Sequence, residues 1–573
     1  MSGGGSSPPA RRLIAVCRAD YTGRYDWLPA HRSSDVTVTL DAIAHADLLD
    51  RGPLPFDEIE TWAQRSAAEH RVGELLAAVR SAPAVAAIEL RGHRLIDFAE
   101  YRLRTELARL LRGWALAQAA GGAKELVCDP LAPPALTMGM RAGMGLDPAV
   151  VPYAPPPELP GSRIARAAMR PVMRGLASVS RPANVRLAAV ATGKLMVAID
   201  ALSDADIRSL NMATMPFPGL DYGNSAVLSL RRRLPMLATL SPRRPPSAPA
   251  VRLPERLALG AEPELDRAVT VLVDRLLSAA ACDLAGALAA LAGLERAPEL
   301  RALLLPSAAY GASRLLIGWA HARGVRVGAM QHGIYAFREF DGGDRLADVV
   351  FAWGEATAEQ ARDWPAPRPA LLPVGVPGMR SATVRSYTDA PRSALVATSN
   401  TVDTPISPTA FCETFLEVLA PGLSLLAAAG VHLKLRPHPN EDPARYRRLL
   451  AHHGLDVEIA AGGPFQAAAE ETDILISSAS SVAFEGAALG LPVLMWLGPA
   501  PRSVRAEHLV EPWVDSAPGL FERAEDFSSL AADLLERPAS AYGAAHQLAR
   551  RLARYAEPFD PVRFADAVRM LAA

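Results

Sequence analysis

Cysteines and long apolar runs are both scarce in this sequence. Its 573 residues include only 4 cysteines, Cys17, Cys128, Cys282 and Cys412, and no two of them form a Cys-x-x-Cys pair. This spacing argues against a disulfide framework and fits a reducing cytoplasm. No stretch reaches the ~18 uninterrupted apolar residues of a membrane span. The start, Met-Ser-Gly-Gly-Gly-Ser-Ser-Pro-Pro, lacks the features of a signal peptide. We therefore expect a cytoplasmic protein that does not cross the membrane.

An excess of charge of either sign is also missing. The 60 basic and 61 acidic residues nearly cancel, which argues against a dedicated nucleic-acid-binding protein. The sequence has no Walker loop, no Gly-x-Gly-x-x-Gly and no His-Glu-x-x-His, so no cofactor is expected. Asp204-Ala205-Asp206 resembles a metal-binding Asp-x-Asp. However, it opens a helical stretch, where first-turn carboxylates complement the helix dipole, and we predict no metal site.

Strand and helix patterns alternate from about residue 300 onward, which predicts parallel sheets covered by helices on both faces. The chain is too long for one hydrophobic core, so we expect two Rossmann-like α/β domains, the first enlarged by helical insertions. The predicted boundaries are a disordered tail at 1–10, an N-terminal domain at 11–376, a hinge at 377–392 and a C-terminal domain at 393–573. Among the predicted strands are Glu125–Cys128, Asp473–Ile476 and Val493–Trp496.

A histidine between two prolines follows the predicted strand His432–Leu435. The segment reads Leu-Arg-Pro-His-Pro-Asn-Glu, with Arg436 and His438 at the exit of the strand. The prolines exclude a helix and restrict the backbone, so the imidazole is held at the edge of the sheet. Beside a bound phosphate, His438 would stabilise charge on the leaving group. A structural role in the turn is the alternative for an isolated His-Pro.

The second motif is the serine-rich segment that follows Asp473–Ile476. It contains Ser477, Ser478, Ser480 and Ser481, and a small-residue helix with Glu485 follows at once. A strand, a turn of serines and a helix N-terminus together make an anion site. Glu485 lies one turn beyond Ser481 on the same helix face, where a carboxylate can accept hydrogen bonds from ribose. Both motifs predict a nucleotide-sugar site, with helix capping as the alternative role for the serines.

These motifs resemble the donor half of bacterial surface-polysaccharide transferases of the GT-B fold. The similar families are the CDP-glycerol glycerophosphotransferases and the capsule Kdo transferases and polysialyltransferases, which carry a His-Pro and a later serine motif. The resemblance covers residues 300–500 and includes Gln331-His332-Gly333, although the usual tryptophan before this histidine is absent. It implies a metal-independent glycosyltransferase with a CMP- or CDP-type donor and a surface glycan or glycolipid acceptor. It also implies ribose binding by Glu485.

The general base has several candidates. His332 follows a predicted buried strand and titrates near neutrality, and Asp20 follows the first strand, Leu13–Cys17. The loop residues Glu339, Asp341 and Asp344 compete for the same role. A structural histidine is an equal alternative at His332. The alternatives at the level of function are a CDP-polyol phosphotransferase, a nucleotide-sugar epimerase and a non-catalytic assembly protein.

One stretch departs from the balanced charge. Residues 161–187 carry six arginines and no acidic residue, and four of them share a helix face at a spacing of three and four. This face is interpreted equally well as an ordinary solvated surface or as a contact with an anionic membrane or acceptor at the inner face of the cytoplasmic membrane. The four residues are Arg163, Arg166, Arg170 and Arg174.

Overall fold

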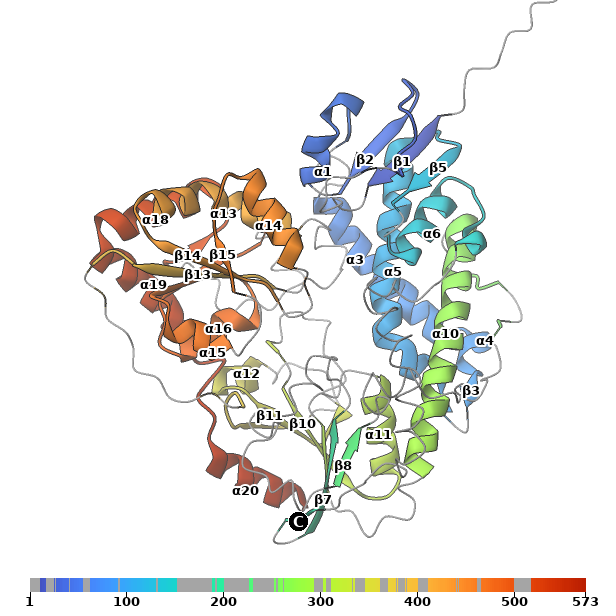
Figure 1. The fold of residues 1–573 in the computed structure, drawn as a ribbon. Helices are drawn as coiled ribbons and strands as arrows, with labels where there is room; N and C mark the ends of the chain where they lie inside the picture. Colours follow the sequence, from blue (N-terminus) through green and yellow to red (C-terminus); the bar gives the residue numbers. More distant parts are fainter. Residues whose placement is uncertain are drawn as a thin grey trace, which may run out of the picture.

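The computed structural model shows an α/β protein in which three parallel or largely parallel sheets are surrounded by helices (Figure 1). It describes residues 11–16, 25, 27–40, 42–54, 62–90, 93–129, 132–151, 188–190, 193–199, 226–229, 252–253, 256–260, 262–292, 302–305, 311–331, 333–334, 346–360, 369–377, 379, 387, 389–399, 411–438, 441, 443–460, 465–498 and 517–572. The expected fold class is therefore confirmed, and the sheets divide the chain in a way that the sequence did not predict.

The first sheet, called here the small sheet, has the order β2-β1-β5 and is parallel throughout. Long helices follow it, and a short antiparallel pair, β3-β4, lies between two of them. The elements of this part are β1 (Arg12–Val16), β2 (Val36–Thr39), α1 (Ala42–Asp47), η1 (Leu49–Arg51), α3 (Trp62–Ser81), α4 (Pro83–Ala86), β3 (Glu89–Leu90), β4 (His93–Arg94), α5 (Leu95–Ala120), β5 (Glu125–Cys128), α6 (Pro134–Gly143), η2 (Pro148–Val150) and α10 (Pro263–Ala292).

The second sheet, called the middle sheet, runs β12-β11-β10-β9-β7-β6, and β8 also pairs with β7. All described pairs are parallel except β6 with β7. Its elements are β6 (Ala188–Val190), β7 (Gly193–Ile199), β8 (Ala226–Ser229), β9 (Ala302–Leu305), α11 (Gly311–His321), β10 (Arg326–Met330), β11 (Val349–Ala352), α12 (Glu355–Gln360) and β12 (Ala370–Pro373). The range of the predicted N-terminal domain, 11–376, thus includes the strands of both the small sheet and the middle sheet.

The two faces of the middle sheet are covered by different parts of the chain. Because successive strand residues face opposite sides, Leu303 and Leu305 join the core formed with α3, α5 and α10. Leu304 instead joins a core with Phe564 of α20 (Pro561–Ala572). The ring of Phe564 lies 5.1 Å, centroid to centroid, from that of Phe351 in β11. The C-terminal helix therefore returns to the middle sheet.

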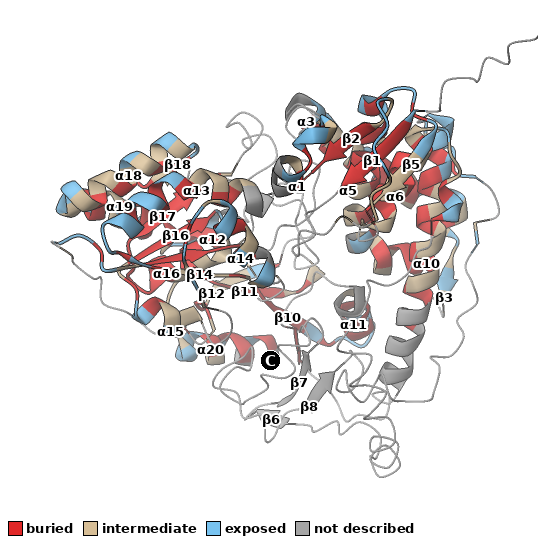
Figure 2. Ribbon diagram, turned by 45° about the horizontal axis from the view of Figure 1, so that its top comes forward, coloured by how far each residue is buried: buried red, intermediate tan, exposed pale blue. Residues whose placement is uncertain are grey.

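The third sheet, called the C-terminal sheet, is parallel in the order β15-β14-β13-β16-β17-β18. Its central strands are continuous apolar runs because helices cover both faces, and Figure 2 shows them buried. Its elements are β13 (Ser393–Ala397), α13 (Phe411–Ala428), β14 (His432–Arg436), α14 (Pro443–His452), β15 (Glu458–Ile459), α15 (Phe465–Glu470), β16 (Ile474–Ser478), α16 (Ser481–Ala488), β17 (Val493–Trp496), β18 (Leu520–Phe521), α18 (Ala524–Glu536) and α19 (Pro538–Leu552).

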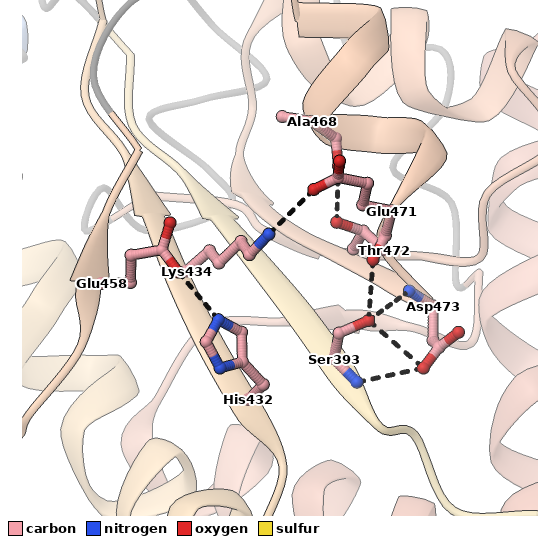
Figure 3. Close-up of polar contacts among 8 residues, drawn as sticks. All are labelled: Ser393, His432, Lys434, Glu458, Ala468, Glu471, Thr472 and Asp473. Carbon is pink, nitrogen blue, oxygen red and sulfur yellow. Dashed lines mark hydrogen bonds and ion pairs between the residues drawn. The ribbon is translucent and has the colours of Figure 1, made fainter.

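Polar contacts hold the amino-terminal edge of the C-terminal sheet in register (Figure 3). The Asp473 carboxylate accepts hydrogen bonds from the backbone N–H groups of Arg392 and Ser393, at 2.8 Å and 3.0 Å. The Asp473 N–H in turn donates to the Ser393 hydroxyl at 3.1 Å. These contacts fix the start of β16 beside the start of β13, and hence which residues of the two strands reach the opposite edge.

Several predicted elements differ from the structure. The stretch Ala86–Leu90 has the pattern of a strand, but only Glu89–Leu90 forms β3, because Pro83 starts the short helix α4. Residues 186–199 also have the pattern of one strand, and the structure places the antiparallel pair β6-β7 within them. Most of the predicted hinge, 377–392, lies outside the described residues, and so does the tail 1–10.

Candidate functional site

The C-terminal sheet has a topological switch point between β13 and β16. Numbered along the chain, its strand order is 3-2-1-4-5-6, so the connections leave β13 and β16 in opposite directions. In such sheets ligands bind outside the carboxyl ends of the strands at this point. Both predicted motifs end there, because β14 ends at Arg436 and β16 at Ser478. Thr398 and Ser399 follow β13 at the same edge.

One face of β14 carries a row of cations. Leu433 and Leu435 point into the core of the C-terminal domain, so His432, Lys434 and Arg436 lie on the opposite face. The first two have partners at the surface. His432 Nε2 lies 2.9 Å from a Glu458 oxygen, and Lys434 Nζ lies 3.0 Å from a Glu471 oxygen (Figure 3).

Arg436, the last cation of the row, interacts electrostatically with the carboxyl group of Glu485 on α16. Burial raises the pKa of Glu485 to about 7, and the positive charge of Arg436 opposes this rise. Burial also lowers the pKa of Arg436, and Glu485 opposes that shift. A carboxyl group with a pKa near neutrality can either accept or donate a hydrogen bond at physiological pH. A carboxyl group with so strongly raised a pKa, beside a charged partner at a strand exit, is typical of a functional site.

The turn that carries His438 is fixed through its backbone. The His438 N–H lies 3.0 Å from Thr398 Oγ1 and 2.9 Å from a Glu441 carboxylate oxygen. The Thr398 hydroxyl also donates to Glu441, and the Glu441 N–H donates to the His438 carbonyl at 2.8 Å. Backbone contacts to Thr398 and Glu441 thus hold the turn, and the imidazole of His438 is partly buried.

The four serines of the second motif have different surroundings. Ser477 and Ser478 are fully buried, because β16 extends two residues beyond the predicted strand. The Ser477 hydroxyl donates to the Ser478 carbonyl at 2.9 Å, and Ser478 Oγ lies 2.8 Å from Ser399 Oγ. In this conformation both hydroxyl groups bond to neighbouring protein atoms at the carboxyl edge of the sheet. Ser480 and Ser481, by contrast, are partly exposed.

Ser480 precedes helix α16 without capping it through its side chain. Its hydroxyl lies 3.3 Å from Ser477 Oγ instead. A helix of this kind keeps N–H groups at its first turn that an anion can accept. The N-cap residue Ser480 therefore does not cap the helix with its side chain, as the alternative role for the serines would require.

The exit of β10 in the middle sheet contacts α16 directly. The Ile334 N–H donates to Ser481 Oγ at 3.3 Å. Gln331 is 1% exposed and bonds within this turn and to β11. The site is thus bordered by both sheets.

Several predicted residues lie outside the described part of the chain. They are Asp20, His332, Glu339, Asp341, Asp344 and the arginines at 163, 166, 170 and 174. Within the described residues, no cluster of three or more His, Cys, Asp or Glu side chains is arranged to hold a metal ion. Among the same residues, no helix is both long and apolar enough to span a bilayer.

Three residues of the site were missed at the level of sequence. Gln331 belongs to the Gln-His-Gly motif, in which only the histidine is assigned a role, and Thr398 directly follows the buried strand β13. Glu441 closed the His-Pro segment without being singled out. A polar residue directly after a buried strand was the available signal for Thr398. The contacts of all three join residues from different elements, which sequence spacing does not reveal.

The raised pKa of Glu485 predicts how stability depends on pH. Below about pH 4.5 both the folded and the unfolded protein keep this proton. As pH rises toward about 7 the unfolded state loses it first, so the ionising group destabilises the fold. Glu485→Gln cannot ionise and should raise the free energy of unfolding by up to about 3 kcal/mol at about pH 8. At about pH 4.5 it should change little. Urea unfolding at both pH values checks this, and an equal gain at both would contradict it.

Comparison with known proteins finds likeness of fold alone. No protein-family model and no curated protein sequence matches the chain. A UDP-GlcNAc 2-epimerase from Neisseria meningitidis, solved bound to UDP-GlcNAc, aligns at 9% identity and a TM-score of 0.39 over 66% of this chain and 98% of its own. An S. aureus MnaA-UDP co-structure aligns at 12% identity and a TM-score of 0.36, covering 65% and 94%. The lipopolysaccharide outer core galactosyltransferase WaaB aligns at 10% identity and a TM-score of 0.34, covering 66% and 99%.

The fold class rests on the sheets of this chain. The C-terminal sheet has the Rossmann order, and the middle sheet is parallel apart from β6. Helix α20 follows the C-terminal sheet in the chain and packs on the middle sheet. The chain is an α/β protein with a C-terminal sheet of Rossmann order, a largely parallel middle sheet and an N-terminal part enlarged by helices.

Proposed function

We propose that the chain is a glycosyltransferase that binds a nucleotide-activated sugar at the switch point of the C-terminal sheet. The observation that carries the proposal is the meeting of four groups at one edge: Arg436, His438, the N-terminus of α16 and Glu485. Cations, helix N–H groups and serine hydroxyls suit phosphate oxygens. A carboxyl group one helical turn away suits the ribose hydroxyls.

In this proposal the protein supplies electrostatic stabilisation to a departing nucleotide. As the bond between sugar and phosphate breaks, negative charge grows on the phosphate oxygens. Arg436 and the His438 imidazole lie at the strand exit where this charge develops, on a turn fixed by Thr398 and Glu441. No divalent ion is needed for this role, because cations and amides neutralise the charge.

The donor and acceptor are proposed in narrower terms on the sequence resemblance. A CMP- or CDP-type donor is favoured, and the acceptor is a bacterial surface polysaccharide or glycolipid. His332 is the first choice of general base toward the acceptor hydroxyl, with Asp20 second. An acceptor of this kind places the protein at the inner face of the cytoplasmic membrane in this proposal.

A thermal-shift screen with CMP, CDP, UDP, GDP and TDP tests the function. A ligand that binds only the folded state raises its stability by about RT ln(1 + [L]/Kd). At least one of the five should raise the unfolding temperature, and the corresponding nucleotide sugar should be consumed with an added glycan acceptor. Phosphorus in the product would identify polyol-phosphate transfer instead, and an altered free sugar would identify an epimerase. No shift with any nucleotide would favour a non-catalytic assembly protein.

The arginine-rich stretch carries a separate prediction. If Arg163, Arg166, Arg170 and Arg174 hold the protein at an anionic surface, each contributes on the order of 1 kcal/mol. Changing all four to glutamine should release the protein from anionic vesicles and leave nucleotide binding unchanged. Vesicle flotation measures this, and added salt should weaken the wild-type attraction. Flotation that the four substitutions do not alter would leave an ordinary solvated face.

A further inference from the structure

The turn after β10 is anchored by one buried side chain. Gln331 Oε1 accepts a hydrogen bond from the Trp353 N–H at 2.7 Å, and Gln331 Nε2 donates to the Gly333 carbonyl at 2.9 Å. Its own N–H donates to the Phe351 carbonyl at 3.1 Å. Both functional groups of the amide are therefore used to fix the turn 331–334 against the end of β11.

This turn touches the N-terminus of α16 through backbone atoms. The Ile334 N–H donates to Ser481 Oγ at 3.3 Å. A Cβ atom built on Gly333 would lie 3.2 Å from the same oxygen, which is tighter than ordinary van der Waals contact. The Ile334 side chain also packs against a hydrophobic cluster that contains Trp353 of the middle sheet and Phe484 of α16. A methyl group at position 333 would therefore displace the Ser481 hydroxyl oxygen by a few tenths of an ångström.

The contact with Ile334 determines which further hydrogen bonds the Ser481 hydroxyl group can make. Its oxygen accepts the Ile334 N–H, and its hydrogen has no acceptor among the residues that the structure describes. Accepting one hydrogen bond polarises a hydroxyl group and strengthens the bond that it donates. The hydrogen is left for a ligand oxygen at the site where the donor phosphate is placed.

We propose that Gln331 and Gly333 are positioning residues for the donor phosphate, acting through the Ile334 N–H on Ser481. This inference rests on the proposed function. The phosphate site is then complete only while the turn 331–334 touches α16. Nucleotide binding and this contact between the two domains stabilise one another by the same factor, because such coupling is reciprocal.

Hydrogen exchange of the full-length protein with and without CDP or UDP tests the coupling. We expect a nucleotide to slow exchange in two separate regions: the amides at the start of α16, and the Gly333–Ile334 amides of the other domain. Protection of α16 alone would overturn the inference and leave the proposed function standing. Protection of neither region with any nucleotide of the screen would overturn both.

A pair of glycine substitutions sharpens the test. Gly333→Ala should weaken nucleotide binding by about 5-fold, the scale of one hydrogen bond, with little change in unfolding temperature. Gly318→Ala is the matched control, because a Cβ there meets nothing within 4 Å. In a Ser481→Ala background Gly333→Ala should have almost no further effect, since both act through one contact. Additive losses, or equal affinities of Gly333→Ala and Gly318→Ala, would show that the turn does not position Ser481.

Discussion

Replacing His438 with alanine is expected to lower the rate of sugar transfer by about 10²-fold or more, the scale of one lost charge-stabilising group. The backbone of the turn is held by Thr398 and Glu441, so the substitution removes the ring and leaves the turn in place. Binding of the donor should change less than the rate, because the charge on the leaving group develops only in the transition state.

Glu485→Ala should behave in the opposite way. Ribose contacts are similar in the ground and transition states, so their loss mainly weakens donor binding. His432→Ala is the matched control for His438, because His432 starts the strand that leads to His438 and its partner Glu458 is at the surface. Steady-state rates with the donor found in the screen separate the two effects. Wild-type turnover in His438→Ala would refute its role.

Gly139→Ala is expected to destabilise the N-terminal part by about 3 kcal/mol or more, on the scale of severe overpacking. Helices α5 and α6 pack backbone against backbone at this point. A Cβ on Gly139 would lie 1.9 Å from the Leu110 carbonyl oxygen, and one on Gly113 would lie 1.9 Å from that of Leu136. Because the obstacle is backbone on both sides, the helices must separate to accept one methyl group.

Gly543→Ala provides the comparison for this change. Gly543 lies inside α19, and a Cβ there meets nothing within 4 Å. Alanine should be neutral or stabilising there, by up to about 1 kcal/mol, because glycine is a poor helix former. Urea unfolding followed by circular dichroism measures both variants. Equal midpoints would show that α5 and α6 are not packed this closely.

The fold of the C-terminal part was largely predictable because its strands are apolar runs between turn residues. Val493–Trp496 was placed as β17, and His432–Leu435 differs from β14 by one residue. The end of β16 was misplaced because pairing with β17 carries Ser477 and Ser478 into the sheet. Serine itself does not favour a strand, so only the neighbouring strands reveal this.

The N-terminal part was harder to predict for a physical reason. The middle sheet takes its strands from between Ala188 and Pro373. The local sequence of these strands does not show that they form a sheet separate from β1, β2 and β5. The long helices α5 and α10 join one core with the middle sheet, so their apolar faces do not mark a domain boundary.

The most direct test of the donor site compares two neighbouring cations on β14. Isothermal titration with the nucleotide found in the screen should show binding to the wild type that survives a chelator. Arg436→Met should weaken it by about 10-fold or more, the scale of a lost charged hydrogen bond. Lys434→Met should leave it unchanged, because Lys434 pairs with the exposed Glu471. Equal affinities of the two variants, or binding that a chelator abolishes, would contradict the account.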